Sequence, residues 1–329
     1  MHFGLTNDQQ ELKATVAALL SARCSPELIR EAIAGNSNST TRLWMQLSEM
    51  GLPLGMVDES SGGLGLDEIA MTGIVEELGR HLVPLPIVET MVVAAPLLVA
   101  AGEWRLLEKL TGGATTATCS LDGTRLIPYP QSDLALIRDG EQVVILENLP
   151  EQVTPRNTTD RSRPIGYVTS LIQTRRLPID ADLQRLASWR GIQATSACLL
   201  GIADQMLQLT VKYVSVRQQF GKPVGSFQAV KHRLADVAID LELTRSMVYA
   251  AGWALAAGEP LAERDVRAAK AMASELAVAT AKACLHSHGG IGYTTEYDLS
   301  LWMKRAWALA AAWGDAASHR QHLSALLEI

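Results

Sequence analysis

Two short segments of this 329-residue sequence combine residue types that suit the binding of a phosphate-bearing ligand. Residues 288–293 read His-Gly-Gly-Ile-Gly-Tyr, at the point where a long helical pattern stops. Glycines at such a point let backbone N–H groups approach an anion without a Cβ in the way, so a dinucleotide pyrophosphate can be held there. The alternative is that Gly289 and Gly290 simply end a helix, as glycine commonly does.

The second segment, residues 217–222, reads Arg-Gln-Gln-Phe-Gly-Lys. The guanidinium of Arg217 can pair with pyrophosphate oxygens, the ring of Phe220 can support an adenine or flank the cofactor, and Gln228 can add a directional hydrogen bond. Taken alone, Arg217 could equally form a surface ion pair and Phe220 could be a core residue. The presence of both segments in one chain favours the ligand site.

Cys284, His286 and His288 form a third group with chemical potential, because thiolate and imidazole are zinc ligands. A structural zinc site needs four ligands, and no fourth candidate lies near these three in the sequence. We therefore predict no metal site.

The elements that must position these residues begin with helices. Residues 6–9 have the spacing of a capping box, and apolar residues then recur on one helical face. Further helical stretches, such as residues 67–79, are separated by prolines and by a Ser-Ser-Gly-Gly break. We expect an all-helical N-terminal domain over residues 1–112.

The pattern changes over residues 113–179. Short apolar segments at 134–137 and 143–146 are joined by Asp139-Gly140, which is typical of a β-hairpin. The alternation of apolar and polar residues is too weak to favour a barrel over a partial sheet. We expect a small, abbreviated middle β-domain.

Helical spacing returns over residues 180–329. Between Val230 and Leu255 apolar positions follow steps of four and three, which predicts the seam of a helix bundle. The predicted fold class is therefore mostly α with a small β-domain, ending in a four-helix bundle. Other expected elements of this domain are stripes at Cys198–Tyr213 and Val266–Ala283 and shorter helices at about 297–312 and 316–328.

Composition and charge exclude several classes of protein. Hydrophobic residues make up 48% of the chain, which indicates a globular protein, and a net charge of −6 without long like-charge runs suggests neither nucleic acid nor a membrane surface as partner. The four cysteines form no CxxC pair, which fits a reducing compartment. The N-terminus lacks a signal pattern, and the apolar run near 91–101 is too short to span a bilayer. We expect a cytoplasmic protein.

The order of helical domain, small β-domain and long bundle resembles the architecture of the acyl-CoA dehydrogenase family. Residues 217–232 match that family's flavin segment in residue type and spacing, and residues 44–65 resemble its first-domain signature. The resemblance implies FAD as cofactor, an acyl-CoA as substrate and an electron acceptor that the sequence does not identify. It also implies a dimer or larger assembly, because this segment of the family reaches into the flavin site of a neighbouring subunit. The cofactor contacts that it implies are Arg217, Phe220, Gln228, Gly289, Gly290 and, where the family commonly has glutamine, His286.

The sequence departs from the family where the catalytic base is expected. Acyl-CoA dehydrogenation needs a carboxylate to take the α-proton of the thioester while a hydride leaves the β-carbon for the flavin. The family's usual glutamate aligns with Gly314, and Asp315 lies one place later. Some members carry the glutamate in a region that corresponds to residues 189–192, where this chain has no carboxylate. The middle domain also lacks the Thr-Glu-Pro and Gly-Ser-Asp segments that contact the flavin ring and the substrate in the family.

These departures lead to one preferred hypothesis and two alternatives. In the first, the chain resembles the short, base-lacking subunit of α2β2 acyl-CoA dehydrogenases that oxidise steroid-derived CoA thioesters, and a larger subunit carries the glutamate. In the second, the chain is an active homo-oligomer with Asp315 as base, although Asp315 also suits the N-cap of the helix that follows. In the third, the chain is a non-catalytic helical scaffold that has lost its cofactor.

Overall fold

The computed structural model describes residues 4–171 and 174–328 of the chain, which form two compact units. Unit 1 contains Met1–Ala22, Thr72–Leu82 and Thr195–Ile329, and unit 2 contains Arg23–Met71 and Val83–Ala194. The expected division into domains at residues 112 and 179 remains a prediction.

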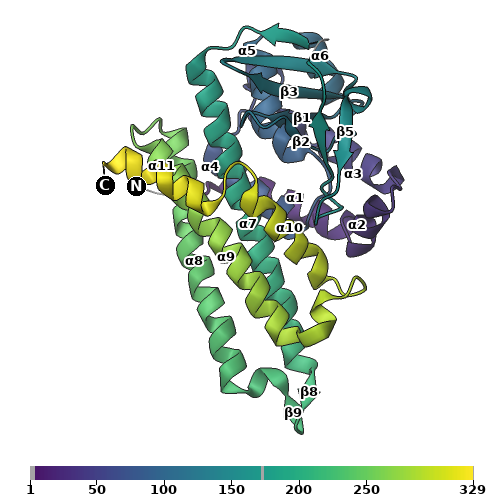
Figure 1. The fold of residues 1–329 in the computed structure, drawn as a ribbon, viewed down its shortest axis with the longest axis vertical. Helices are drawn as coiled ribbons and strands as arrows, with labels where there is room; N and C mark the ends of the chain where they lie inside the picture. Colours follow the sequence, from purple (N-terminus) through teal and green to yellow (C-terminus); the bar gives the residue numbers. More distant parts are fainter. Residues whose placement is uncertain (1–3, 172–173, 329) are drawn as a thin grey trace. The chain divides into compact units, whose positions relative to one another are not determined.

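The predicted fold class is confirmed, because the chain is mostly helical with a small region of strands (Figure 1). The helices of the first third are α1 (Asn7–Arg23), α2 (Pro26–Ile33), α3 (Asn38–Glu49), α4 (Glu68–Arg80), a π-helical segment (Glu89–Ala94), α5 (Ala95–Ala100) and α6 (Trp104–Thr111). The later helices are α7 (Ala181–Val216), α8 (Gln228–Ala256), α9 (Ala262–His288), α10 (Leu299–Ala311) and α11 (Ala316–Leu327).

The first helix begins as its sequence predicts. The backbone N–H of Gln9 donates to the hydroxyl oxygen of Thr6 at 3.3 Å, and the Gln9 side-chain oxygen accepts from the Thr6 N–H at 3.0 Å. These two bonds satisfy donors that the start of a helix otherwise leaves unpaired. The capping box is therefore confirmed.

The bundle of unit 1 is built on the predicted seam of α8. From Leu234 to Leu255 the seam positions are buried, and α8 packs against α9, which lies beside it in Figure 1. α9 presents small buried residues such as Ala269 and Ala273, which let neighbouring helices come close. The predicted bundle seam is confirmed.

Two glycines set an even closer contact within unit 1. A Cβ on Gly201 of α7 would lie 1.9 Å from the backbone oxygen of Glu76 in α4, and a Cβ on Gly79 would lie 2.2 Å from the backbone oxygen of Cys198. No other residue fits at either position without moving a backbone. The two helices therefore touch backbone to backbone.

Unit 2 contains two small sheets, with strand orders β1-β3-β4-β7 and β2-β6-β5. β3 and β4 are antiparallel, with Asp139 opposite Gln142, and Gly140 between them has a φ of +62°, so the predicted hairpin is confirmed. An apolar core lies under these strands, including Ile137, Val144 and Leu146. The strands are β1 (Ala117–Ser120), β2 (Leu126–Pro128), β3 (Leu134–Asp139), β4 (Gln142–Glu147), β5 (Val153–Arg156), β6 (Ile165–Val168) and β7 (Thr174–Leu177).

Candidate functional site

A short hairpin carries the aromatic residue that the sequence singled out. Strands β8 (Gln218–Gln219) and β9 (Lys222–Pro223) connect α7 to α8 and lie at one end of these helices (Figure 1). The turn residues Phe220 and Gly221 both have positive φ, of 51° and 78°, as in the tight turns that match strand twist. The Phe220 side chain is 91% exposed. Its alternative interpretation as a core residue is therefore wrong.

Arg217 lies at the base of this hairpin, and its backbone is held on both sides. Its N–H donates to the oxygen of Tyr213 at 2.9 Å, and its carbonyl accepts from the N–H of Val224 at 2.7 Å. Its side chain is exposed and makes no ion pair with any residue that the structure describes. The alternative of a surface ion pair therefore finds no support within those residues. Gln228, the first residue of α8, is also exposed.

The glycine turn follows α9 directly. Gly289 has a φ of +70°, and an added Cβ at either Gly289 or Gly290 would meet nothing within 4 Å. Both glycines are exposed, and so is His286 in the last turn of α9. The N–H of Gly289 donates to the carbonyl oxygen of Leu285, whereas no Cβ would hinder an anion that approaches Gly290.

A stack of aromatic rings joins the end of α7 to the end of α9. The ring centroids of Tyr213 and His288 are 4.2 Å apart with an interplanar angle of 19°, and Tyr297 lies 5.0 Å from the His288 ring. The contact places Arg217, one turn after Tyr213, at the same end of unit 1 as the glycine turn. Sequence reasoning treated Tyr213 only as part of an apolar stripe, because its ring partner is distant in the chain.

His288 and Cys284 serve this packing. His288 is buried, and its Nδ1 lies 2.8 Å from the carbonyl oxygen of Cys284. Burial lowers the pKa of His288 and raises the pKa of the Cys284 thiol to about 11, so both side chains are uncharged near neutral pH. Among the described residues, no group of three or more His, Cys, Asp or Glu side chains could hold a metal ion.

The turn between α10 and α11 contains Gly314, which aligns with the family's catalytic glutamate, and Asp315, the alternative base. Trp313 and Gly314 have φ of 59° and 93°, and a Cβ on Gly314 would lie 3.0 Å from Nε2 of His319. A glutamate at Gly314 would therefore strain the backbone and crowd the histidine. Asp315 caps α11, and its Oδ1 accepts the N–H of Ser318 at 2.8 Å.

Two buried side chains hold this turn in place through its backbone oxygens. Nζ of Lys270 donates to the carbonyl oxygens of Gly314 at 2.9 Å and Ala310 at 3.2 Å and to Oγ of Ser274 at 2.8 Å. Nε2 of His319 lies 3.0 Å from the carbonyl oxygen of Trp313. Burial lowers the pKa of Lys270 to about 7, and burial together with the Lys270 charge lowers that of His319 to about 4. Sequence reasoning missed both residues.

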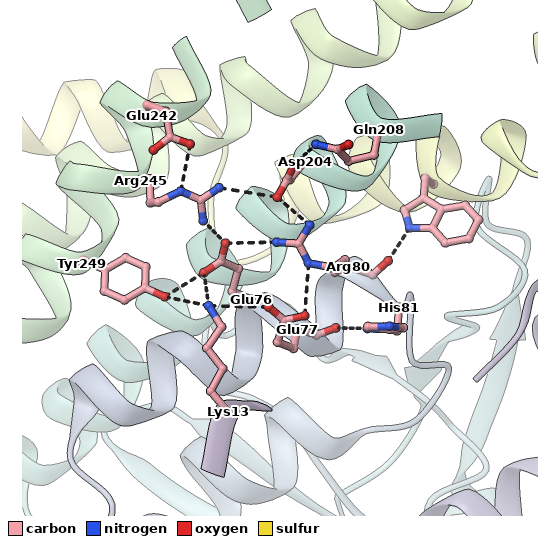
Figure 2. A network of polar contacts seen from close by, with 11 residues as sticks. Lys13, Glu76, Glu77, Arg80, His81, Asp204, Gln208, Glu242, Arg245 and Tyr249 are labelled. Carbon is pink, nitrogen blue, oxygen red and sulfur yellow. Dashed lines mark hydrogen bonds and ion pairs between the residues drawn. The ribbon is translucent and has the colours of Figure 1, made fainter. Parts of the chain in front are cut away.

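A second feature that the sequence did not predict is a network of charged side chains in unit 1 (Figure 2). At its centre is the fully buried Glu76 of α4. Its carboxylate is ion-paired with Lys13 at 3.1 Å, Arg80 at 3.6 Å and Arg245, and accepts from the Tyr249 hydroxyl at 2.7 Å. Burial alone raises the pKa of Glu76, but these cations outweigh it, so the pKa lies below its ordinary value. The network joins α1, α4, α7 and α8.

Comparison with known proteins identifies the family. The sequence matches the acyl-CoA dehydrogenase N-terminal domain family over residues 6–111 and the acyl-CoA dehydrogenase C-terminal domain family over residues 185–327. It is 31% identical over 327 residues to the acyl-CoA dehydrogenase IpdE2 of Mycolicibacterium smegmatis, covering 98% of this chain and 99% of that protein. Two further solved structures with this fold, at 19% and 20% identity, are FAD complexes of PigA.

Solved structures with the same fold include two at 25% identity. One is the Tcur3481-Tcur3483 steroid ACAD G363A variant, with a TM-score of 0.86 and coverage of 98% of each chain. The other is the ChsE4-ChsE5 complex from Mycobacterium tuberculosis, with a TM-score of 0.85 and coverage of 100% of this chain and 99% of that one. Over the residues described here, no helix has the length and apolar character needed to cross a membrane.

Proposed function

The chain belongs to the acyl-CoA dehydrogenase family, and on that premise we propose that it is the base-lacking subunit of a heteromeric, FAD-dependent acyl-CoA dehydrogenase acting on a steroid-derived CoA thioester. A larger subunit supplies the catalytic glutamate and the pocket for the flavin ring. This chain supplies contacts to the diphosphate end of FAD. The names of the two related structures, a steroid ACAD and a two-component complex, support this choice of substrate and partner.

The residues at the end of α7 and α9 fit the phosphate end of such a cofactor. The glycine turn leaves open space on the side where a Cβ would stand, and the exposed Arg217 side chain has no ion-pair partner among the described residues. A guanidinium fork and a backbone that an anion can approach without a Cβ in the way suit a pyrophosphate. Phe220 presents its ring outward, Gln228 adds an exposed amide, and His286 stands where it can donate a hydrogen bond.

The closed turn at Gly314 is the single observation that carries the proposal. The position that aligns with the family's glutamate has a backbone conformation suited to glycine, and its carbonyl is held by the buried Lys270. This turn is therefore built as a structural connection, without a carboxylate aimed at a substrate. When bound, FAD would accept the hydride from the β-carbon of the acyl group. The α-proton must then go to a base from another subunit.

The alternative with Asp315 as base is less well supported by the same turn. The Asp315 carboxylate accepts the N–H of Ser318, which satisfies the start of α11. A general base must lie within hydrogen-bonding reach of the proton that it removes, and a displacement of about 1 Å can cost on the order of 10²-fold in rate. The cap engages Oδ1 and holds the carboxylate at the start of α11, so Asp315 could act as a base only from that position, through Oδ2.

The first test is to express the chain alone and together with a genomically adjacent acyl-CoA dehydrogenase, and to record flavin absorbance and assembly mass. We expect bound flavin and dehydrogenase activity only in the co-expressed sample. Full activity from the chain alone, abolished by Asp315→Ala, would refute the proposal in favour of the homo-oligomer. Samples that stay colourless with added FAD, even in a stable complex of the two chains, would favour the scaffold.

A matched pair of glycine variants tests the cofactor contact. Gly290→Ala adds a methyl group where the structure has open space, so we expect unchanged thermal stability and reduced FAD occupancy in the complex. Gly112→Ala is the control, because its Cβ would make only ordinary contacts at 3.6 Å or more and it lies far from the glycine turn in sequence. Equal FAD occupancy in both variants would contradict the role assigned to Gly290.

A further inference from the structure

Unit 2 contains a cavity that the proposed flavin site does not use. Its volume is about 660 Å³, which is within the range of small-molecule binding sites. None of the residues proposed to contact FAD lines it, and none of its lining residues belongs to unit 1. The lining residues come from five stretches, within residues 32–44, 84–86, 113–116, 131–133 and 161–164.

Two side chains in the cavity lining carry buried polar atoms without partners. Trp44 is 3% exposed and Ser132 is 1% exposed, and neither Nε1 of Trp44 nor Oγ of Ser132 forms a hydrogen bond within the described part of the chain. The indole N–H can only donate, so its partner must be an acceptor. Both atoms are closed to solvent, so a ligand in the cavity would contact these two residues through their other atoms.

The charged residues of the lining favour an anion. Arg161 is exposed, its one hydrogen bond is a long contact of 3.5 Å to the carbonyl oxygen of Ile33, and it makes no ion pair with the residues described. Its neighbour Arg163, in contrast, is buried and paired with Glu89 at 3.2 Å. The guanidinium of Arg161 is thus free to form a charge-assisted pair with a carboxylate.

The acidic residue of the lining is already engaged by the protein. Oδ2 of Asp133 accepts hydrogen bonds from the backbone N–H of Thr116 at 2.7 Å and from the Thr116 hydroxyl at 3.1 Å. These bonds hold the residue that precedes strand β1. The rest of the wall is uncharged and includes hydroxyl-bearing residues, with Pro84, Leu85 and Pro86 as apolar surface. This lining suits a ligand with an apolar body and an acidic group.

We propose that this cavity binds a small organic carboxylate, with its charge at Arg161 and its apolar body against residues 84–86. The site is separate from the residues assigned to the flavin. The proposal therefore stands or falls independently of the proposed function.

Decanoate is a suitable probe, with decanol as the uncharged molecule of equal chain length. Binding is measured by isothermal titration to the full chain as purified, and the indole N–H signals of the tryptophans are followed by ¹H–¹⁵N spectra. We expect one decanoate per chain, at least tenfold tighter than decanol, with a shift of the Trp44 indole signal. Trp44→Phe assigns that signal, and Ser132→Ala provides a second lining variant that keeps the ring.

Variants of arginine decide the role of the charge. Arg161→Met should weaken decanoate binding about tenfold or more, whereas Arg138→Met, an exposed arginine of β3 outside the cavity, should leave it unchanged. The proposal is overturned if decanoate shows no saturable binding, if decanol binds equally well, or if Arg161→Met binds like the unmodified chain. Saturable binding that leaves the Trp44 signal in place would also overturn it, because the ligand would then lie elsewhere.

Discussion

Replacing Glu76 by glutamine should destabilise unit 1 more than any exposed ion pair could. The substitution keeps the shape of the side chain but removes the negative charge among Lys13, Arg80 and Arg245 (Figure 2). Each cation would keep another carboxylate, Glu77 for Lys13 and Arg80 and Glu242 for Arg245, but the one buried charge that all three share would be lost. The helices that they join would lose their common counter-charge.

The structure sets the size of this effect. Removing one member of a buried ion pair typically costs about 3–5 kcal/mol, because the remaining charge is left uncompensated. The cation side chains here are 23–24% exposed, so water compensates part of the loss and the lower end, about 3 kcal/mol, applies. For a chain of 329 residues about 3 kcal/mol corresponds to a fall in Tm of roughly 4 °C.

The assay is thermal and urea denaturation of Glu76→Gln beside the matched control Glu275→Gln. Glu275 pairs with Arg320 on the surface, where both side chains are about half exposed, so its loss should cost no more than about 1 kcal/mol. Equal destabilisation by the two variants would refute the reasoning, because it would mean that the buried network has no more effect than a solvated pair.

The pH dependence gives an independent check of the same carboxylate. Because the folded-state pKa of Glu76 lies below its unfolded value of 4.5, its contribution is fully present above about pH 4.5 and is lost as the pH falls through the folded value. The difference in stability between the natural chain and Glu76→Gln should therefore be constant near neutral pH and shrink in acid. A difference that grows below pH 4.5 would contradict the assigned shift.

Three further predictions follow from the buried groups and the close helix contact. Lys270 has a pKa of about 7 in the folded chain against 10.5 when unfolded, so the free energy of unfolding should rise between these pH values by up to about 1.4 kcal/mol per pH unit. Lys270→Met should remove this rise in urea titrations at pH 7 to 9.5. Asp315→Ala should cost about 1 kcal/mol through the lost cap, with unchanged turnover of the complex; a large fall in turnover at unchanged stability would instead indicate a base. Gly201→Ala should lower the unfolding free energy by about 3 kcal/mol, because its methyl group meets the Glu76 backbone, whereas Gly112→Ala should leave it nearly unchanged in the same melts.

Periodicity and local chemistry were enough to predict most of the fold. The capping box at Thr6, the seam of α8 and the hairpin at Gly140 each depend on residues within a few positions of one another, so their signals are present in the sequence. The same is true of Asp315 as an N-cap, which depends on its own neighbour Ser318.

The parts that escaped prediction depend on partners distant in the chain. In the sequence Lys270 is one charged residue among others of α9, and its partner, the carbonyl oxygen of Gly314, lies 44 residues later. The ring of Tyr213 likewise stacks on His288, which is distant in the chain. Glu76 lies in a stretch that the sequence predicts only as a helix, and two of its counter-charges come from α1 and α8. Long-range pairing of this kind leaves no spacing pattern in a single sequence.

The hairpin that carries Phe220 also bears on the kinetics of assembly. Its two-residue turn, its strand pairs and the edge contact of Phe220 with Phe227 at 6.1 Å hold the tip in one conformation within a single chain. A segment that is ordered beforehand loses little conformational entropy on docking. In the proposed heteromeric complex, docking of this hairpin on the other subunit should therefore proceed without a folding step. Subunit exchange would then be governed by the lifetime of the interface.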